Sequence, residues 1–479
     1  MQILNALRSR NITVGGLCAD SRKVAPGDVF VALPGANADG RHFIAQAVAR
    51  GASAVLHDAG GGSVGECEVP VLAVPDLPSL SGEIAHLVYG CPSEKLWLAG
   101  ITGTNGKTSV SQWLARSLDL LGRKCAVIGT LGNGFPGALQ ESPNTTPDAI
   151  AVHRLLAGFV AQDAGACAME VSSIGLDQGR VNAACFAVAA FTNLTRDHLD
   201  YHPDMAAYAA AKAKLFEHPG LGCAVLNLDD EFGRTLAGRL RGRVPTIGYT
   251  LEGAGGTDRV LAAGQLEIGG AGISFMLDGL RVEAPLLGRF NAANLLAVIG
   301  LLQAGGYALP RIIPVLARLH PPPGRLQTLG GGKSPLLVID YTHSPDALEK
   351  ALVVLRETAQ ARRGKLVCVF GCGGNRDAGK RPLMGAVAER LADSVVVTSD
   401  NPRSEDPAAI IAAICAGMRA APSIEPDRTQ AIVRAVHAAG ACDVILIAGK
   451  GHEAYQEIAS VRHAYSDLEV ATRALETWQ

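Results

Sequence analysis

The decisive stretch of this sequence is Gly100-Ile101-Thr102-Gly103-Thr104-Asn105-Gly106-Lys107-Thr108-Ser109. An apolar run at 96–99, typical of a buried strand, leads into it, and apolar residues at helical spacing follow at 110, 113, 114 and 118. A glycine-rich turn lets backbone N–H groups approach a polyphosphate, and the helix N-terminus favours its charge. Lys107 would neutralise the distal phosphates, and Thr108 would place a hydroxyl on Mg²⁺. The stretch predicts a nucleotide site, with ATP as the expected ligand.

The loop is shorter than the full P-loop pattern, which has a glycine six residues before the lysine. Ile101 stands at that position, so the form is Gly-x-x-Gly-Lys-Thr. An ordinary turn before a helix can show the same residues, but the flanking strand and helix favour phosphate binding. What the nucleotide drives has to come from the rest of the chain.

The bulk composition indicates a soluble globular protein. Its 479 residues are too many for one core and suggest about three domains. The 43 basic and 45 acidic residues give a net charge of −2, which excludes the basic footprint of a nucleic-acid-binding domain.

The chain also shows no sequence pattern of export or membrane insertion. The amino terminus lacks the charged start and apolar core of a signal peptide, and no run reaches the roughly 18 apolar residues of a membrane span. The 11 cysteines have no zinc-ligand spacing, which favours free thiols in a reducing compartment. We therefore expect a cytoplasmic protein, acting as a monomer.

Alternating strand and helix patterns predict an α/β fold of three domains, at 1–93, 94–322 and 323–479. The linkers are Cys91-Pro92-Ser93 and Pro321-Pro322-Pro323. We expect a smaller N-terminal α/β domain, a central mononucleotide-binding domain with a mostly parallel sheet, and a Rossmann-like C-terminal domain. Strands of the last two are predicted at 95–101, 124–130, 165–171, 186–193, 222–228, 243–249, 336–341, 365–370, 393–398 and 443–448.

Polar residues at the carboxyl ends of these strands are the candidates for chemistry. Glu170 ends the strand 165–171, where a Mg²⁺ beside a phosphate loop needs a carboxylate, although it could simply pair with a lysine. His198 and His202 stand at i and i+4, but no third zinc ligand accompanies them, so a single imidazole on a phosphate-bound metal fits better. Lys212 and Lys214 share one helix, and spacing alone does not choose between them.

Further motifs lie along the chain in a fixed order. They are Gly103-Thr104-Asn105-Gly106-Lys107-Thr108, Met169-Glu170-Val171-Ser172-Ser173, Asn193 with Asp197-His198, Tyr208 with Lys212, Leu287-Gly288-Arg289-Phe290-Asn291-Ala292-Ala293-Asn294, Pro323-Gly324-Arg325-Leu326, Asp340-Tyr341-Thr342-His343-Ser344-Pro345-Asp346 and Gly371-Cys372-Gly373-Gly374-Asn375-Arg376-Asp377. Together they resemble the Mur ligases, and within them the members that add the third residue of the peptidoglycan stem peptide. The resemblance covers essentially the whole chain.

The resemblance implies roles for individual residues. Thr108, Glu170, His198 and a carbamylated Lys212 would bind two Mg²⁺ ions, with Lys107, Lys212 and His198 as catalytic residues. The implied ATP site comprises Gly103, Thr104, Asn105, Gly106, Lys107, Thr108, Ser109, Asn291, Asn294, Arg325, Asp340 and His343. The implied site for the nucleotide-sugar dipeptide comprises Ala19, Ser21, Ala36, Asn37, Ala38, Asn144, Thr145, Thr146, Ser172, Gln178 and Arg180. Two departures are Ile174, where the family commonly has histidine, and the side chains of Ala36-Asn37-Ala38.

The loop Asp400-Asn401-Pro402-Arg403 can be a simple turn before a helix that starts near Asp406. Arg403 also offers a planar fork that pairs a carboxylate bidentately. In the resembled family this loop marks enzymes that add meso-diaminopimelate, which differs from lysine by one distal carboxylate. The implied site for this amino acid comprises Arg376, Asp400, Asn401, Pro402, Arg403, Gly449 and Glu453.

The resemblance implies a bacterial ligase that joins meso-diaminopimelate to UDP-N-acetylmuramoyl-L-alanyl-D-glutamate through an acyl phosphate. The first domain would bind the UDP-sugar, the central domain ATP, and the third the amino acid. The alternatives are the same ligase using L-lysine, a sister ligase of the folylpolyglutamate-synthetase type or one adding the next dipeptide, and an ATP-driven switch or transport ATPase.

Overall fold

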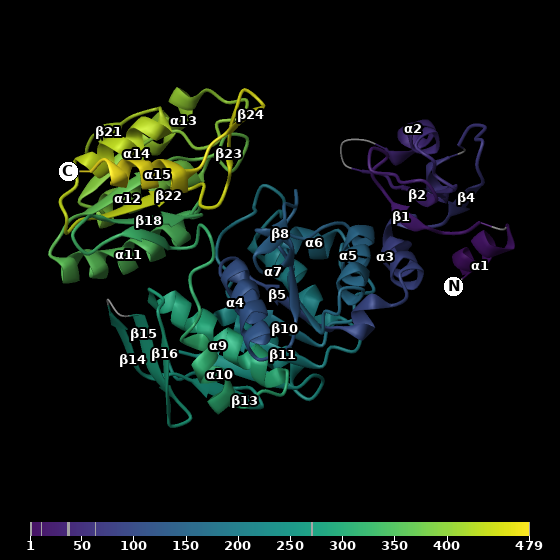
Figure 1. The fold of residues 1–479 in the computed structure, drawn as a ribbon, viewed down its shortest axis with the longest axis horizontal. Helices are drawn as coiled ribbons and strands as arrows, with labels where there is room; N and C mark the ends of the chain where they lie inside the picture. The colour runs from purple at the N-terminus through teal and green to yellow at the C-terminus, as the bar shows by residue number, and fades with distance from the viewer. Residues whose placement is uncertain (1, 11, 36–38, 63, 270–271, 479) are drawn as a thin grey trace.

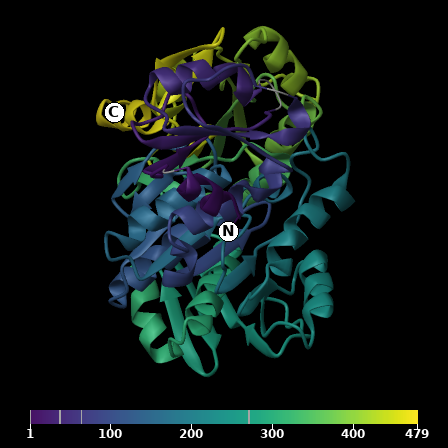
Figure 2. The ribbon, with the colours of Figure 1, turned by 90° about the vertical axis from the view of Figure 1, so that its right-hand side faces the viewer.

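The computed structural model describes residues 2–10, 12–35, 39–62, 64–269 and 272–478. Figure 1 shows three α/β units, with the N-terminal and C-terminal units on opposite sides of a central one. Seen from the right-hand side of Figure 1, the first unit stands in front of the third, and both lie above the central unit (Figure 2). The units hold separate sheets.

The first unit is built around a parallel sheet in the order β1-β2-β3-β4. Helix α3 packs against this sheet and against α5 of the central unit, so it lies at the junction. The elements are α1 (Gln2–Ser9), β1 (Gly16–Cys18), β2 (Asp28–Ala32), α2 (Ile44–Ala49), β3 (Ala54–Asp58), β4 (Val71–Val74) and α3 (Leu77–Val88).

The central sheet has the strand order β13-β12-β11-β10-β5-β9-β6-β7-β8. It is parallel from β13 to β6, and β7 and β8 add an antiparallel edge. Its strands are β5 (Trp97–Thr102), β6 (Cys125–Gly129), β7 (Gly132–Phe135), β8 (Ala138–Gln140), β9 (Ala166–Glu170), β10 (Val188–Phe191), β11 (Cys223–Asn227), β12 (Thr246–Thr250) and β13 (Arg259–Ala262). Because the register pairs Ile101 of β5 with Glu170 of β9, their carboxyl ends meet at one edge.

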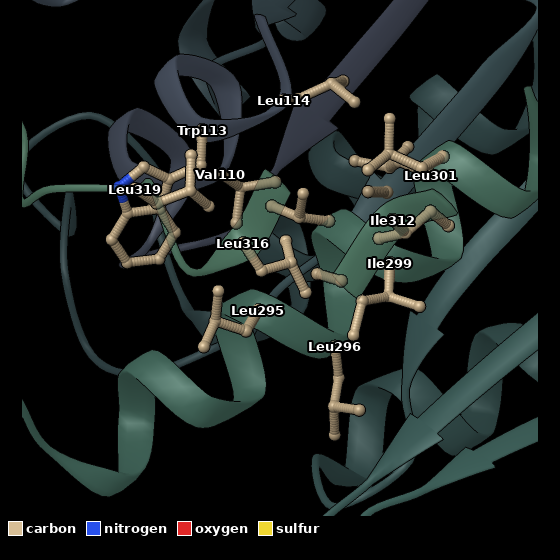
Figure 3. Close-up of a cluster of buried hydrophobic side chains, with 14 of the residues drawn as sticks. Val110, Trp113, Leu114, Leu295, Leu296, Ile299, Leu301, Ile312, Leu316 and Leu319 are labelled. Carbon is tan, nitrogen blue, oxygen red and sulfur yellow. The ribbon is translucent and has the colours of Figure 1, made fainter. Parts of the chain in front are cut away.

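Helices cover both faces of this sheet. They are α4 (Lys107–Leu120), α5 (Ala149–Val160), α6 (Ser173–Asp177), α7 (Met205–Ala213), α8 (Glu231–Leu240), α9 (Arg289–Ala304) and α10 (Leu309–Leu316). Asp148, Asp204 and Asp230 cap three of them by accepting from backbone N–H groups of the first turn. The apolar faces of α4, α9 and α10 meet in a buried cluster that includes Val110, Trp113, Leu296 and Ile312 (Figure 3).

A small antiparallel sheet, β14 (Gly264–Gly269), β15 (Gly272–Leu277) and β16 (Leu280–Ala284), extends the central unit. The third unit has the strand order β17-β18-β22-β19-β20-β21, parallel except for β17. Its strands are β17 (Gln327–Gly330), β18 (Leu336–Asp340), β19 (Leu366–Phe370), β20 (Ser394–Val397), β21 (Ser423–Ile424) and β22 (Val444–Ala448). A hairpin of β23 (Tyr455–Ile458) and β24 (Val461–Ala464) follows.

The helices of the third unit are α11 (Pro345–Arg362), α12 (Lys380–Leu391), α13 (Pro407–Cys415), α14 (Arg428–His437) and α15 (Asp467–Glu476). Ser344, Asp406, Asp427 and Ser466 are their side-chain N-caps, on α11, α13, α14 and α15 respectively. The predicted helix start near Asp406 is therefore confirmed.

The predicted fold class is confirmed, and each predicted strand of the last two units is present within a few residues. Sequence patterns missed short or amphipathic elements such as β1, α3, β7, β8, β17 and the β23–β24 hairpin. The connection predicted at 91–93 includes the start of a 3₁₀ turn, Pro92–Lys95, in which Pro92 and Ser93 are buried. Among the described residues, none of the helices has the length and apolar character needed to span a bilayer.

Candidate active site

The phosphate loop has the backbone form that its glycines predict. Gly103 has φ 149° and a Cβ there would overlap Thr192 Oγ1. Gly106 has φ 86°, and its Cβ would lie 2.5 Å from Asn294 Oδ1. The segment after β10 holds the loop, because Asn193 Oδ1 accepts from Asn105 N at 2.9 Å and Thr192 Oγ1 donates to Asn105 O at 2.6 Å. Ser109 is buried in the first turn of α4.

Two lysine side chains converge on this loop. Lys107 Nζ donates to Gly103 O and Thr104 O, both at 2.9 Å, and Lys212 Nζ donates to Gly103 O at 2.9 Å. Lys212 is 1% exposed and its ammonium lies over the Tyr208 ring. Burial, and the charge of Lys107, hold the pKa of Lys212 well below its usual value. Lys214 points elsewhere and pairs with Asp177 at 2.8 Å.

Glu170 is fully buried beside the loop. Its carboxylate accepts from Thr108 Oγ1 at 2.9 Å, from Thr130 N at 3.1 Å and from Thr130 Oγ1 at 3.0 Å. The alternative in which Glu170 pairs with a lysine does not describe this shell, which consists of hydroxyls and an amide. Sequence analysis missed Thr130, although its place just after β6 is the strand-end signal that identified Glu170.

His198 lies at the same edge, in a left-handed conformation with φ 54°. Its Nε2 is 3.6 Å from Asp197 Oδ2. Burial lowers the pKa of His198 to about 4, so the imidazole is neutral at physiological pH and can act as a metal ligand. His202 instead is buried, with Nε2 3.0 Å from Ser173 Oγ, away from any paired-histidine arrangement.

The third unit reaches into this site through two hydrogen bonds. Arg325 Nη2 donates to Thr108 Oγ1 at 3.1 Å, and Asn105 Nδ2 donates to Asp346 Oδ2 at 3.1 Å. The Arg325 guanidinium also lies over the Tyr341 ring. Asp346 and Tyr341 belong to the motif at 340–346, but neither was predicted as a site residue.

Other residues predicted for the ATP site take different places. Asn291 and Asn294 are buried at the start of α9, joined by a 3.1 Å hydrogen bond, with Asn294 against Gly106. Asp340 is buried and holds the Arg325 turn by accepting from Leu326 N at 2.7 Å. His343 is exposed, with Nδ1 2.9 Å from Tyr341 O.

A second group of predicted residues lies next to Glu170. Thr146 Oγ1 donates to Glu170 O at 2.9 Å and lies 3.2 Å from Ser172 Oγ, which caps α6. Arg180 Nη1 donates to Thr146 O at 2.8 Å, and its Nη2 donates to Gln178 Oε1 at 2.7 Å. Thr145 contacts Thr130, and Asn144 is exposed nearby in the chain. The fold brings this group together beside the predicted magnesium ligands.

The residues predicted in the first unit lie apart from this edge. Ser21 is buried and donates to Gln46 Oε1 at 2.7 Å, and Ala19 packs against the core of the first sheet. Ala36, Asn37 and Ala38 lie outside the described residues. Ile174, the departure noted from the resembled family, is half-buried in α6.

The loop after β20 meets the loop after β22. Asn401 Nδ2 donates to Glu453 Oε2 at 2.8 Å, and Lys450 Nζ donates to Asn401 Oδ1 and Glu453 Oε2 at 2.8 and 3.0 Å. Lys450 is fully buried; it stands between the predicted residues Gly449 and Glu453 but was not itself predicted as part of the site. A Cβ at Gly449 would overlap Asp400 Oδ2, so glycine is required where the two loops touch.

Arg403 lies in the loop after β20, with φ 55° and a side chain that is 20% exposed. Its Nη1 donates to Gly374 O at 2.7 Å and its Nε is 3.8 Å from Glu457 Oε2. Arg376 is exposed on the neighbouring loop, and Pro402 is buried. All residues predicted for the incoming amino acid thus lie on strand-end loops of one sheet.

Family models match most of the chain in three consecutive parts. The model described as "Mur ligase family, catalytic domain" matches residues 13–89, "Mur ligase middle domain" matches 101–302, and "Mur ligase, glutamate ligase domain" matches 324–451. The chain belongs to the Mur ligase family.

Curated relatives extend the match over the full length of this Mur ligase. A protein of Pseudomonas aeruginosa is 53% identical over 98% of this chain and 96% of its own length. One of Neisseria meningitidis serogroup A is 50% identical over 96% and 94%. Both are named UDP-N-acetylmuramoyl-L-alanyl-D-glutamate–2,6-diaminopimelate ligase.

Solved structures show the same architecture. One of a protein with that same name has a TM-score of 0.68 at 36% identity, covering 97% of this chain and 95% of the other. MurF from Acinetobacter baumannii reaches 0.69 at 18% identity, covering 97% and 94%. Since two proteins with different names fit equally well, the fold by itself does not select the amino acid to be joined.

Proposed function

We propose that this Mur ligase joins meso-diaminopimelate to UDP-N-acetylmuramoyl-L-alanyl-D-glutamate at the expense of ATP, in bacterial peptidoglycan precursor synthesis. The observation that carries the proposal is the convergence of the phosphate loop, Glu170 and Lys212 at one sheet edge, with Arg325 of the third unit hydrogen-bonded to Thr108. Full-length similarity to relatives that carry this ligase name supports it.

The donors at this edge fit magnesium. Thr108 supplies a hydroxyl, Glu170 a carboxylate, and His198 a neutral imidazole. When bound, Mg²⁺ would draw negative charge from the phosphate oxygens. Thr108 and Thr130 fix the orientation of the Glu170 carboxylate, and Asp197 lies beside His198.

Lys212 fits the role of a carbamate. Burial holds the pKa of this lysine well below its usual value, which favours the neutral amine over the ammonium relative to an exposed lysine. A neutral amine attacks the carbon of CO₂, an N–C bond forms and one proton leaves, giving an anion. The added negative charge would turn a lysine that repels Mg²⁺ into one of the two-metal site's ligands, whereas Lys214 stays paired with Asp177.

The reaction we infer has two steps. The γ-carboxylate of D-glutamate attacks the γ-phosphorus of ATP, the bond to ADP breaks, and an acyl phosphate forms. The amine of diaminopimelate then attacks the acyl carbon, loses a proton and expels phosphate. Lys107 of the phosphate loop and Arg325, which is hydrogen-bonded to Thr108, offset charge on the phosphates, so catalysis consists of positioning and charge stabilisation.

Arg403 would choose the amino acid. Its guanidinium can pair the distal carboxylate of diaminopimelate and would repel the ammonium of lysine. Arg376 on the adjacent loop adds positive charge, while Asn401 and Glu453 offer polar groups for the amino and carboxyl groups of the same molecule. The loop at Asp400–Arg403 distinguishes this proposal from a folylpolyglutamate-synthetase-like activity.

We assign the nucleotide-sugar dipeptide to the first unit and to the group Asn144, Thr145, Thr146, Ser172, Gln178 and Arg180. We place the domain boundaries at 93/94 and 322/323 and propose that the enzyme acts as a monomer. The substrates are small precursors, so we expect the enzyme to act in the cytoplasm without nucleic acid.

Phosphate release and product mass, measured with each substrate omitted in turn, test the proposal. We expect phosphate and the UDP-tripeptide to form only with ATP, UDP-dipeptide and meso-diaminopimelate together, and not with L-lysine or ornithine. Equal use of lysine would overturn the choice of amino acid. Sustained ATP hydrolysis without either substrate would instead support an ATP-driven switch.

A further inference from the structure

Arg428 and Asp467 form an ion pair in which both side chains have no exposed surface. Arg428 Nε donates to Asp467 Oδ1 and Nη2 to Asp467 Oδ2, both at 2.7 Å. Arg428 is the first residue of α14 and Asp467 the first of α15, so the pair joins two helix N-termini. The positive end of the α14 dipole disfavours an arginine there, so helix stability does not explain this residue.

The remaining donors of Arg428 point to two strand-end loops. Its Nη1 donates to Ser399 O at 3.3 Å and its Nη2 to Ala448 O at 2.9 Å. These carbonyls immediately precede Asp400 and Gly449, which belong to the site proposed for diaminopimelate. Since β19 lies between β20 and β22, one guanidinium spans a whole strand.

A buried ion pair is weak grounds for stability by itself. Replacing such a pair with apolar residues of similar volume is often neutral or stabilising, because both charges lose their hydration. An apolar pair at these positions could not donate hydrogen bonds to Ser399 O and Ala448 O. The two loops also touch directly, because Gly449 packs against the Asp400 carboxylate.

We propose that the Arg428–Asp467 pair is a positioning device for the amino-acid site. Asp467 fixes the guanidinium, and the guanidinium fixes the spacing between the 399–403 loop and the 449–453 loop. Arg428 touches no substrate and acts through these loops on Asn401, Arg403 and Glu453. The inference rests on the proposed function for its kinetic test, but not for its structural one.

The decisive variant is the apolar double replacement Arg428→Met/Asp467→Leu, assayed for ligation as the full-length enzyme. We expect the KM for meso-diaminopimelate to rise about tenfold or more, because small misplacements of a positioned site carry such costs. The KM for ATP should stay within about twofold, since the phosphate loop lies on another sheet. Arg428→Lys, which keeps the charge but loses the fork, should give an intermediate KM.

Arg356→Met is the matched control. Arg356 pairs with Asp393, just before β20, and donates to Leu391 O, while Asp393 also accepts from Leu366 N at the start of β19. It is therefore an arginine–aspartate pair of similar chemistry, but it lies at the amino ends of strands whose carboxyl ends carry the amino-acid site. We expect the Arg356→Met variant to have the same KM for diaminopimelate as the unaltered enzyme.

Hydrogen exchange of the unliganded protein tests the same inference without any assay of activity. In Arg428→Lys and in the double variant, peptides covering 399–403 and 449–453 should exchange faster, while the phosphate-loop peptide should not change. A folded double variant with unaltered KM and unaltered exchange would overturn the inference and leave the proposed function standing. If the double variant does not fold, Arg428→Lys decides by the same two measurements. Failure of the unaltered enzyme to ligate diaminopimelate would overturn the proposed function. Hydrogen exchange would still test whether the Arg428–Asp467 pair positions the two loops.

Discussion

The phosphate loop at 103–108 and the amino-acid loop at 399–403 both follow parallel strands, yet they hold their cations differently. Lys107 and Lys212 donate to carbonyls of the phosphate loop itself. Arg403 instead donates to Gly374 in another loop and lies beside Glu457 of the β23–β24 hairpin. The two lysines of the first site thus both bind one strand–loop–helix unit, whereas Arg403 is held by two separate segments.

The cations also differ in chemistry. Burial lowers the pKa of both Lys107 and Lys212, so their charge depends on their surroundings. Arginine keeps its charge in any protein environment. A site that activates phosphate can use an amine whose charge is adjustable, whereas a site that selects a carboxylate is served by a permanent cation.

The largest expected effect comes from the phosphate-loop side. Lys212→Ala should lower kcat about 100- to 1,000-fold, the usual cost of losing one electrostatic contact to a reacting group. Added bicarbonate should not restore it. Lys214→Ala is the control on the same stretch and should change kcat by less than about twofold, as expected of an exposed ion pair. A fully active enzyme whose intact mass shows no CO₂ adduct would contradict the carbamate.

On the other loop, Arg403→Asn should raise the KM for meso-diaminopimelate about 100-fold, because a charged bidentate contact is lost. Discrimination against lysine should fall with it, and the KM for ATP should not change. Arg462→Asn is the control, since Arg462 also faces Glu457 but is largely exposed. Unchanged selectivity in Arg403→Asn, measured by competition between the two amino acids, would refute its role as selector.

A smaller effect should come from the hydrogen bond between the phosphate loop and the third unit, which joins Asn105 to Asp346. Asp346→Ala removes the acceptor for Asn105 and should raise the KM for ATP about three- to tenfold, as for one hydrogen bond to a charged group. Glu349→Ala, on the same helix but paired with Arg390 at the surface, should leave the KM within experimental error. Equal effects of both variants would mean that the contact between units does not assist ATP binding.

The smallest expected effect is a loss of folding stability at acidic pH, which limits the pH range in which the two loops can be compared in the folded enzyme. Burial lowers the pKa of His153 from 6.5 to about 4. The unfolded chain therefore binds more protons than the folded one between these values, so stability falls as the pH is lowered from 6.5 to 4. His153→Gln should show a smaller fall in Tm across this window. His463→Gln, on the exposed strand β24, should behave like the unaltered protein. Identical curves of Tm against pH for all three proteins would show that His153 does not cause the loss of stability.

Much of the fold could be predicted because its signals are local. The apolar strands, the glycines of the phosphate loop and caps such as Asp406 act within a few residues, and the structure confirms them. The β23–β24 hairpin escaped prediction because its two short strands, Tyr455–Ile458 and Val461–Ala464, show no alternation of buried and exposed residues. Their conformation depends on pairing rather than on a pattern of their own.

Within the candidate sites, most of the residues at strand ends could be predicted from the sequence, although Thr130 after β6 and Lys450 after β22 were missed. Glu170 and Arg403 stand in recognisable motifs. Arg428 gives no such signal, because an isolated arginine is usually exposed and here it is buried and bound to a carbonyl 20 residues away. Lys450 lies between the predicted residues Gly449 and Glu453, but its contact with Asn401 depends on the packing of two separate loops.

The sequence by itself determined the strand–loop–helix unit at 100–109, the α/β order of the chain and, through resemblance, the kind of ligase. The resemblance also selected Lys212 over Lys214. Only the tertiary structure decided that hydroxyls and a backbone amide rather than a lysine surround Glu170, that Arg325 reaches Thr108 and that Lys214 pairs with Asp177. The reason is physical. Local pattern fixes which strands form, but the register between parallel strands and the packing of separate units fix which side chains meet.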